Sequence, residues 1–271
     1  MNRTFPNLLV LVLACVAPAA AQERTRVADE PPAQSTVQPT SAGMVAIQQA
    51  AAARKFAFMF FWKEKSAATD KAWSVLQSAV AKVSDVATVA AVQVTNPAEQ
   101  ELVARYDLSR TPMPFVLVIA PCGAITKALS GEFTEAQLRS ALVSPCTQLC
   151  LKAIQDRKLV LLCVLNRQMA RDPRALPVAA RDFKADARFE AATEIVLLNS
   201  EDAGEAGFLE QLKVDPRAPR PLTVLLAPPG AVVGTFDAQA TKEQLVAQLA
   251  AAQSNPCAGG KCGPNGCGPK K

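Results

Sequence analysis

Cysteine is the residue type in this sequence with the most distinctive chemistry, because a thiolate can exchange with a disulfide or bind a soft metal. The chain of 271 residues contains eight cysteines and no histidine. Without histidine it cannot form a Ser-His or Cys-His catalytic pair, or a metal site that needs an imidazole ligand. Any chemistry of its own therefore depends on where its thiols lie.

Two cysteines fall in the segment SPCTQLCLKAI, where Ser144 as N-cap and Pro145 at the first helical position predict the start of a helix. Cys146 is then expected in the first turn, where a helix N-terminus favours a thiolate. Cys146 and Cys150 share a helix face but are too far apart for an unstrained disulfide in a regular helix. They could bind a soft metal, or one could bridge to Cys122. A structural bridge or free thiols is the favoured interpretation.

The C-terminal segment 253–271 ends in NPCAGGKCGPNGCGPKK, with Cys257, Cys262 and Cys267 at every fifth residue. It has no apolar run that could fold, so a flexible extension is expected. Its three thiols could ligate Cu(I) or zinc, or cross-link to a partner or an envelope component. The spacing fits no standard zinc pattern. No cofactor is expected, and a soft metal held by cysteines remains the alternative.

The N-terminus has the pattern of a secretory signal. Residues 1–21 hold one early positive charge, a short apolar run and small residues before the predicted cleavage point. The stretch VLAC, ending at Cys15, also resembles a lipoprotein signal that would place a lipid anchor on that cysteine. No later run predicts a membrane-spanning helix. Export to the periplasm or the medium is the prediction, with a membrane-anchored lipoprotein as the alternative, and 22–42 is expected to be a disordered linker.

Length and charge narrow the class of protein. The chain is long for one small domain and suits two of ordinary size. Its formal net charge of +5 is spread along the chain, and no basic stretch alternates with aromatic residues. Nucleic acid is therefore not an expected partner.

The first half of the chain alternates helical and strand patterns. Continuous apolar runs of strand length predict buried strands, and apolar residues at helical spacing predict the helices between them. This order predicts an α/β fold with a central mixed sheet flanked by helices. The expected elements are helix 44–55, strand 56–62, helix 72–83, strand 86–94, helix 96–108, hairpin 114–131 and helix 134–143.

Residues 43–145 resemble a thioredoxin-fold domain. The segment FWKEK, 61–65, matches the aromatic lead-in of that family, and SAAT, from Ser66 to Thr69, occupies the Cys-x-x-Cys position. Pro114, in RTPMPF, matches the proline that is cis in the family and faces the redox site. The resemblance therefore implies a fold whose redox site has lost both cysteines.

This substitution decides the chemistry of the first site. Thiol–disulfide exchange needs one thiolate to attack sulfur and a second thiol to resolve the mixed disulfide. The hydroxyls of Ser66 and Thr69 do not ionise readily and cannot form that bond. They are good residues for a helix start instead. A redox-inactive site with a capping role is the prediction.

The second half repeats the first. RTPMPFVLVIAPCGA, 110–124, aligns without gaps with RAPRPLTVLLAPPGA, 217–231, and KFAFMFFW corresponds to KLVLLCVL. We therefore expect a second thioredoxin-like domain over 146–252. Its counterpart of SAAT is MARD, from Met169 to Asp172, and Pro221 stands where Pro114 does. Cys163, within KLVLLCVL, is interpreted as a buried small hydrophobic residue.

These expectations combine into one function. The chain is predicted to be an exported tandem thioredoxin-like protein without oxidoreductase activity, which binds an extended polypeptide or an envelope protein as a chaperone-like scaffold. In the family, the backbone before the cis-proline pairs with an extended substrate. Here Met113-Pro114 and Arg220-Pro221 would provide that edge, with Trp62 beside the first. The alternatives are an oxidoreductase that uses Cys146 and Cys150 or the tail, and a protein that binds Cu(I) or zinc.

Overall fold

The computed structural model describes residues 41–169, 172, 175–218 and 220–254. The predicted signal peptide with Cys15, nearly all of the predicted linker, and the tail cysteines Cys257, Cys262 and Cys267 lie outside these residues. None of the described helices is long and apolar enough to cross a membrane.

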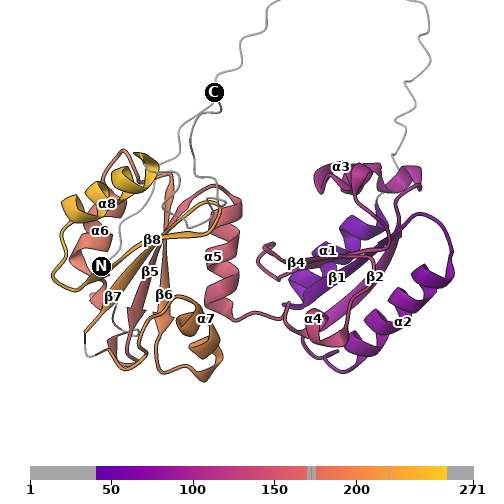
Figure 1. Ribbon diagram of the computed structural model, residues 1–271, viewed down its shortest axis with the longest axis horizontal. Helices are drawn as coiled ribbons and strands as arrows, with labels where there is room; N and C mark the ends of the chain where they lie inside the picture. Colours follow the sequence, from indigo (N-terminus) through magenta and orange to yellow (C-terminus); the bar gives the residue numbers. More distant parts are fainter. Residues whose placement is uncertain (1–40, 170–171, 173–174, 219, 255–271) are drawn as a thin grey trace, which may run out of the picture. The chain divides into compact units, whose positions relative to one another are not determined.

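The first domain contains helices on both sides of a four-stranded sheet with the order β2-β1-β3-β4 (Figure 1). β1 and β2 are parallel, and the other neighbouring pairs are antiparallel. The sheet is therefore mixed, as expected. The elements are α1 (Ala42–Ala52), β1 (Phe56–Trp62), α2 (Ala67–Ala81), β2 (Ala87–Gln93), α3 (Gln100–Arg105), β3 (Phe115–Ile119), β4 (Ile125–Ser130) and α4 (Glu135–Arg139).

The second domain repeats this architecture with the strand order β6-β5-β7-β8. β5 and β6 are parallel, and β7 is antiparallel to both β5 and β8. The prediction of two tandem α/β domains with mixed sheets is confirmed. The elements are α5 (Pro145–Gln155), β5 (Leu159–Leu165), α6 (Val178–Ala185), β6 (Thr193–Asn199), α7 (Ala206–Gln211), β7 (Leu222–Ala227), β8 (Ala231–Asp237) and α8 (Lys242–Ser254).

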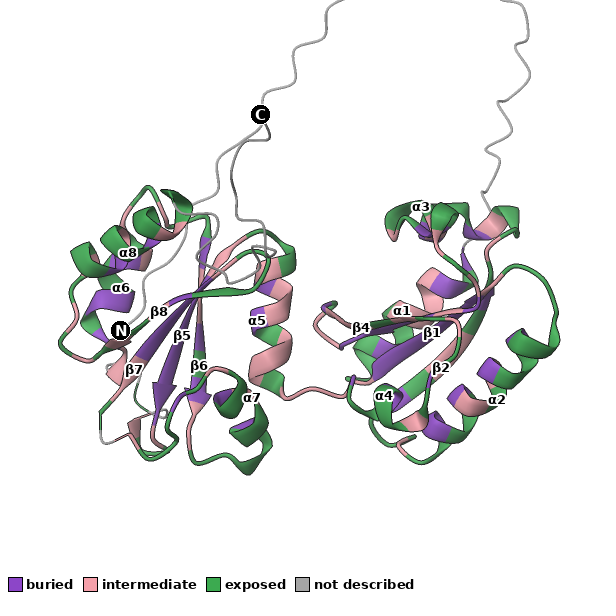
Figure 2. Cartoon of the chain, in the orientation of Figure 1, coloured by how far each residue is buried: buried purple, intermediate pink, exposed green. Residues whose placement is uncertain are grey.

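The central strands explain why each domain folds around its sheet. Every residue of β1 except Trp62 is buried, so its consecutive apolar side chains serve the cores on both faces (Figure 2). Phe58 and Phe60 pack on the face covered by α2 and α4. Met59 and Phe61 pack on the opposite face, under α1 and α3. The burial of one strand on two faces thus fixes the layers of the domain.

Several element boundaries differ from the sequence expectation. The helix expected from residue 72 begins at Ala67, because Ser66 caps it. The helix expected over 96–108 is divided into a 3₁₀ turn at Pro97–Glu99, α3, and a second 3₁₀ turn at Leu108–Arg110. At the C-terminal end, α8 continues to Ser254, past the expected boundary at 252.

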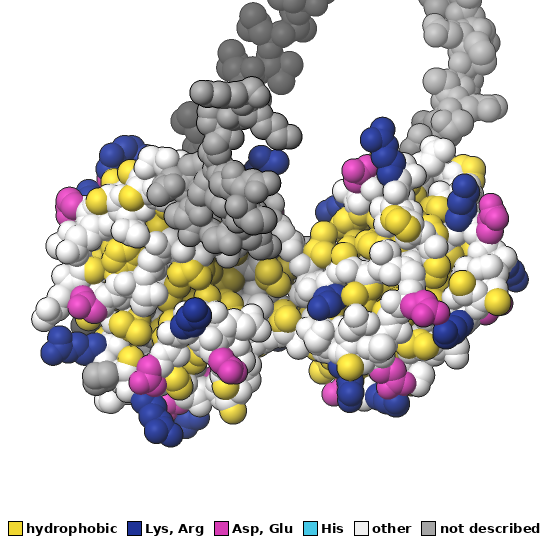
Figure 3. Space-filling model, in the orientation of Figure 1, with side chains coloured by type: hydrophobic (Ala, Val, Ile, Leu, Met, Phe, Trp, Pro, Cys, Tyr) yellow, Lys and Arg dark blue, Asp and Glu magenta, His cyan; other side chains and the backbone are white. Residues whose placement is uncertain are grey.

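Surface charge is mixed on both domains. On the face shown in Figure 3, lysine and arginine side chains alternate with aspartate and glutamate, and apolar side chains lie between them. This agrees with the even spread of charge along the sequence.

Candidate functional site

The position where a redox pair would stand is the N-terminus of α2. Ser66 is the N-cap, and its Oγ accepts a hydrogen bond from the Thr69 backbone N–H at 3.1 Å. The two hydroxyl oxygens, Ser66 Oγ and Thr69 Oγ1, lie 3.0 Å apart, and Thr69 Oγ1 donates to the Glu64 carbonyl at 3.1 Å. Both hydroxyls are therefore engaged in starting the helix, as the sequence predicts.

A second backbone feature lies at the same end of the sheet. Phe61 on β1 is opposite Phe115 on β3, so Trp62 and Pro114, the next residues of the two antiparallel chains, are at that end. The Met113–Pro114 peptide bond is cis. The Pro114 carbonyl accepts from the Gly131 N–H at 2.9 Å. Within the described residues, neither the N–H nor the C=O of Met113 has a hydrogen-bond partner.

The second domain does not reproduce this site. The Met169 N–H donates to Asn166 Oδ1 at 2.8 Å, and the Asp172 N–H donates to the Met169 carbonyl at 3.0 Å. The helix on this side, α6, begins only at Val178. Met169 and Asp172, the expected counterparts of Ser66 and Thr69, therefore lie in the segment before α6 and do not cap it.

The proline of the second domain also differs from the expectation. The cis bonds of the described chain are Met113–Pro114 and Pro228–Pro229, so the bond between Arg220 and Pro221 is not among them. The cavity that Arg220 and Pro221 line with Met169 has a volume of only about 10 Å³. That is barely room for one water molecule. The second domain therefore lacks the cis bond that marks the edge in the first domain, and little space is left beside Pro221.

Both domains have a thioredoxin-like fold. The mixed four-stranded sheet covered on both faces, and in the first domain the helix start and cis-proline at one sheet end, give this arrangement. No family model matches the sequence, and no curated protein matches it.

Solved structures of thioredoxin-fold proteins resemble the chain at low sequence identity. The germline-specific thioredoxin Deadhead of Drosophila melanogaster is 20% identical, with a TM-score of 0.31, over 37% of this chain and 90% of that chain. The first two thioredoxin domains of Saccharomyces cerevisiae Eps1p are 12% identical, with a TM-score of 0.31, over 80% and 98%. Zinc-bound human ERp44 is 11% identical, with a TM-score of 0.35, over 83% and 60%.

The four cysteines in the described residues are free thiols. Cys122 and Cys146 are half-buried, whereas Cys150 and Cys163 are buried. Cys163 is fully enclosed in the core of the second domain, in agreement with its interpretation as a small hydrophobic residue. The described part of the chain has no group of three or more cysteine, aspartate or glutamate side chains placed to hold a metal ion.

Cys146 lies in the first turn of α5, and the predicted start of this helix is confirmed: Ser144 is the N-cap and Pro145 follows it. Burial, together with the nearby charge of Glu205, raises the pKa of the Cys146 thiol to about 12, against the effect expected of a helix N-terminus. The thiol donates to the Leu197 carbonyl, with an S···O distance of 3.1 Å.

Glu205 is a functional neighbour that sequence reasoning missed. Ser144 Oγ donates to Glu205 Oε2 at 2.5 Å, and the Cys146 N–H donates to Glu205 Oε1 at 3.2 Å. Burial and the same carboxylate raise the pKa of Cys150 to about 12. The positive end of the α5 dipole attracts an anion, and the carboxylate of Glu205, from the same domain, is that anion.

The first domain has the same arrangement around Glu99. Ser41 Oγ donates to Glu99 Oε2 at 2.5 Å, and the Gly43 N–H lies 3.3 Å from each carboxylate oxygen. Both acids follow a capping residue by three positions, Asn96 before Glu99 and Asp202 before Glu205. The same spacing occurs after the second strand of each domain. It is the sequence pattern from which the two buried carboxylates could have been predicted.

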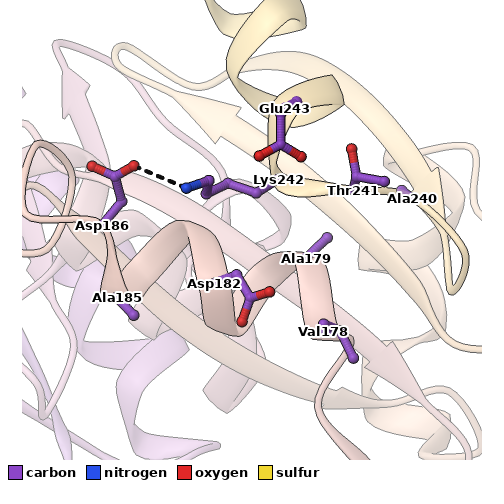
Figure 4. Close-up of a pocket in the computed structure, with 9 residues that line it drawn as sticks. All are labelled: Val178, Ala179, Asp182, Ala185, Asp186, Ala240, Thr241, Lys242 and Glu243. Carbon is purple, nitrogen blue, oxygen red and sulfur yellow. Dashed lines mark hydrogen bonds and ion pairs between the residues drawn. The ribbon is translucent and has the colours of Figure 1, made fainter.

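A further pocket, of about 490 Å³, lies between α6 and the start of α8 in the second domain (Figure 4). Asp186 points to Lys242 across it, at 3.3 Å. Hydrogen bonds from Arg188 and from Lys242 hold the pKa of Asp186 well below its usual range. Because its central carboxylate is already paired, this pocket is not the candidate functional site.

Proposed function

We propose that the chain is an exported, redox-inactive tandem thioredoxin-like protein whose first domain binds extended polypeptide segments. The observation that carries this proposal is the free backbone of Met113 beside the cis-bonded Pro114, at the sheet end where Ser66 and Thr69 replace a thiol pair. The site keeps a surface for recognition and lacks the groups for exchange.

The chemistry of the hydroxyls supports the loss of redox activity. A hydroxyl cannot form the mixed disulfide on which exchange depends. Ser66 and Thr69 are also occupied with each other and with the Glu64 carbonyl. The two thiols of α5 offer no replacement, because the pKa values of Cys146 and Cys150 are both raised to about 12, which leaves almost no thiolate at neutral pH.

The geometry at Met113 supports polypeptide binding. A free N–H and C=O on one residue can pair with the backbone of an extended segment, which is the hydrogen-bonding unit of strand addition. Met113 is half-buried and adjoins a buried proline, so its backbone is held in place by the fold. The proposal assigns this role to the first domain, since the peptide bond before Pro114 is cis and the one before Pro221 is not among the cis bonds.

Export rests on the N-terminal sequence. The predicted signal at 1–21 would carry the chain to the periplasm or the medium, where it would meet unfolded or extended envelope proteins. A lipid on Cys15 would instead hold the same binding domain at a membrane surface.

Redox inactivity is tested by turnover. With the purified mature chain, reduction of a protein disulfide by dithiothreitol should proceed at the uncatalysed rate. Turnover that disappears in the double variant Cys146→Ser, Cys150→Ser would replace this proposal by redox chemistry at α5.

Polypeptide binding is tested by capture. A photoreactive side chain in place of Met113 should cross-link to a reduced and carboxymethylated protein, whereas the same group in place of Val232, an exposed residue of β8, should not. A peptide ligand that binds should lose affinity when its backbone nitrogens are methylated, because N-methylation removes the donors that pair with Met113. Equal capture at both positions would show non-specific binding and contradict the proposal.

A further inference from the structure

A pocket of about 240 Å³ lies in the first domain between α2 and the edge of the sheet. Its walls are aromatic or small apolar side chains, and the rings of Phe60 and Trp73 contact each other with centroids 5.1 Å apart. Trp62, which ends β1, forms another wall beside the proposed polypeptide site. The lining residues are Phe60, Trp62, Lys65, Thr69, Asp70, Trp73 and Ala91.

The mouth of this pocket carries one charge of each sign. Lys65 and Asp70 are both exposed, and neither side chain forms an ion pair or hydrogen bond within the described residues. By contrast, Lys71 in α2 is paired with Glu132 at 2.9 Å, and Lys82, the C-cap of α2, with Glu135 at 2.6 Å. Lys65 and Asp70 are thus both available to a ligand at the pocket mouth.

The second domain lacks the residues that form these walls. Strand register places Cys163 at the position of Phe60, Leu165 at that of Trp62 and Leu197 at that of Ala91. Both tryptophans of the chain are in the first domain. The hollow beside Ala91 thus distinguishes one repeat from the other, and Leu197 shows that the fold accepts a leucine at that position.

We propose that this pocket is the specificity pocket of the first domain and receives an aromatic side chain of the bound polypeptide. Indole walls offer an aromatic ring both apolar burial and favourable ring-to-ring contacts. A cation would be attracted by Asp70 and repelled by Lys65, and an anion the reverse, so the mouth gives neither a net advantage. A neutral ring whose flanking peptide groups present both donors and acceptors suits a mouth with both charges.

The inference rests on the proposed function and names the class of polypeptide that the site selects. Trp62 connects the two features, since it lines the pocket and lies at the sheet end where Pro114 precedes β3. A segment paired with Met113 would need to extend past Trp62 by only a few residues, at about 3.3 Å for each residue of extended chain.

The test uses capped peptides of the form Gly-Ser-X-Ser-Gly, with X as phenylalanine, alanine or trimethyllysine. Because both tryptophans of the chain line the pocket, intrinsic fluorescence reports its occupancy directly. The phenylalanine peptide should change the emission saturably and bind about tenfold or more tightly than the alanine peptide. Equal affinities for these two peptides, or tighter binding of trimethyllysine, would overturn the assignment, the latter in favour of a cation site.

A variant matched to the second domain sharpens the test. Ala91→Leu places in the pocket the residue that stands at the equivalent strand position of the other repeat, so the fold should be retained. It should weaken binding of the phenylalanine peptide about tenfold or more and remove the preference for that peptide over the alanine peptide. The control Ala81→Leu, at an exposed position at the far end of α2, should leave the affinity for the phenylalanine peptide and its preference over the alanine peptide unchanged. Circular dichroism and thermal unfolding check that both variants fold.

The outcomes separate this inference from the proposed function. If Met113 captures polypeptide but Ala91→Leu leaves the aromatic preference intact, the pocket assignment is wrong and the binding function stands. If Met113 captures nothing while Ala91→Leu still abolishes phenylalanine-peptide binding, the proposed function is wrong, and the pocket is a site for an aromatic ligand without the strand pairing.

Discussion

The backbone N–H of Cys146 donates to the carboxylate of Glu205 at 3.2 Å, so the N-terminus of α5 already holds an anion from its own domain. A free helix N-terminus would stabilise a thiolate at this position. The Glu205 charge acts in the opposite direction and helps to keep the Cys146 thiol protonated. Burial and this carboxylate together keep Cys146 from behaving as the reactive thiol that its place in the first turn of a helix would suggest.

Glu205→Gln should make Cys146 more reactive. The change removes a negative charge that raises the thiol pKa but keeps an oxygen acceptor for Ser144 and the Cys146 N–H. Alkylation by iodoacetamide near neutral pH should accelerate about threefold for each unit of pKa removed, because a tenfold gain in thiolate is partly offset by lower nucleophilicity. Mass spectrometry of the alkylated peptides measures the rate at each cysteine.

Two internal controls accompany that experiment. Glu99→Gln, the equivalent change in the first domain, should leave Cys146 unaffected. The fully buried Cys163 should stay unmodified in both variants. Faster alkylation of Cys163 would mean that the second domain had opened, and an unchanged rate at Cys146 would exclude an electrostatic role for Glu205.

Stability should fall at alkaline pH, partly through Cys163. Burial raises the pKa of its thiol from an ordinary value of 9.0 to about 12. The unfolded chain therefore releases this proton before the folded chain does. The protonated Cys163 thiol therefore contributes fully to the free energy of unfolding below pH 9. This contribution is lost as the pH rises from 9 to 12, by up to about 1.4 kcal/mol per pH unit for one thiol.

Urea unfolding at pH 8 and pH 10 measures this effect. Cys163→Ala should be less stable than the parent at pH 8, because it leaves a small cavity in the core. It should nevertheless lose less stability than the parent between the two pH values. An identical pH-dependent loss in both proteins would show that the pKa of the Cys163 thiol does not differ between the folded and unfolded states.

Gly43→Ala should destabilise the first domain. A Cβ built at Gly43 would lie 2.4 Å from Leu102 Cδ2 and 2.9 Å from Val92 Cγ2, so the packing at the start of α1 must shift. The cost should be about 1–3 kcal/mol, the usual range for overpacking. Tryptophan fluorescence during urea unfolding isolates this domain, since both tryptophans belong to it.

The matched control is Gly207→Ala in α7. A Cβ at that position meets nothing within 4 Å, and alanine favours a helix over glycine by roughly 0.5–1 kcal/mol. This change should leave the tryptophan transition where it is. A destabilisation by Gly43→Ala no larger than the effect of Gly207→Ala would show that α1 adapts to the extra methyl group.

Ser66→Cys together with Thr69→Cys should form a disulfide on oxidation. The two hydroxyl oxygens lie 3.0 Å apart at the N-terminus of α2, so thiols in their place would be close neighbours. Thiol counting under denaturing conditions, with and without reductant, detects the bond. The single variants serve as controls, and a folded double variant that keeps two free thiols would show that the geometry does not support a redox pair.

The C-terminal tail should be separable from the fold. Its composition offers no apolar run to a core, so a chain that ends at Ser254 should unfold at the same temperature as the full mature chain under reducing, metal-free conditions. Calorimetry compares the two. A clear loss of thermal stability on truncation would assign Cys257, Cys262 and Cys267 a structural role.

The sequence by itself determined the tandem arrangement, the fold class of the two domains and the helix start at Ser66. The evidence was local or periodic: the continuous apolar run of β1, the repeated proline pattern and the capping pair Ser66 and Thr69. Patterns of this kind can be recognised from the order of residues alone. The helix start at Ser144 and Pro145 is of the same kind, because a cap depends on residues three positions apart.

Only the tertiary structure decided what these positions can do. Glu205 reaches Cys146 from 59 residues away, and only the folded chain shows that this carboxylate lies at the N-terminus of α5. The small cavity at Pro221 and the aromatic pocket beside Ala91 likewise depend on side chains brought together from separate elements. The pKa of a thiol and the volume of a pocket are set by neighbours in space, and the sequence orders residues only along the chain.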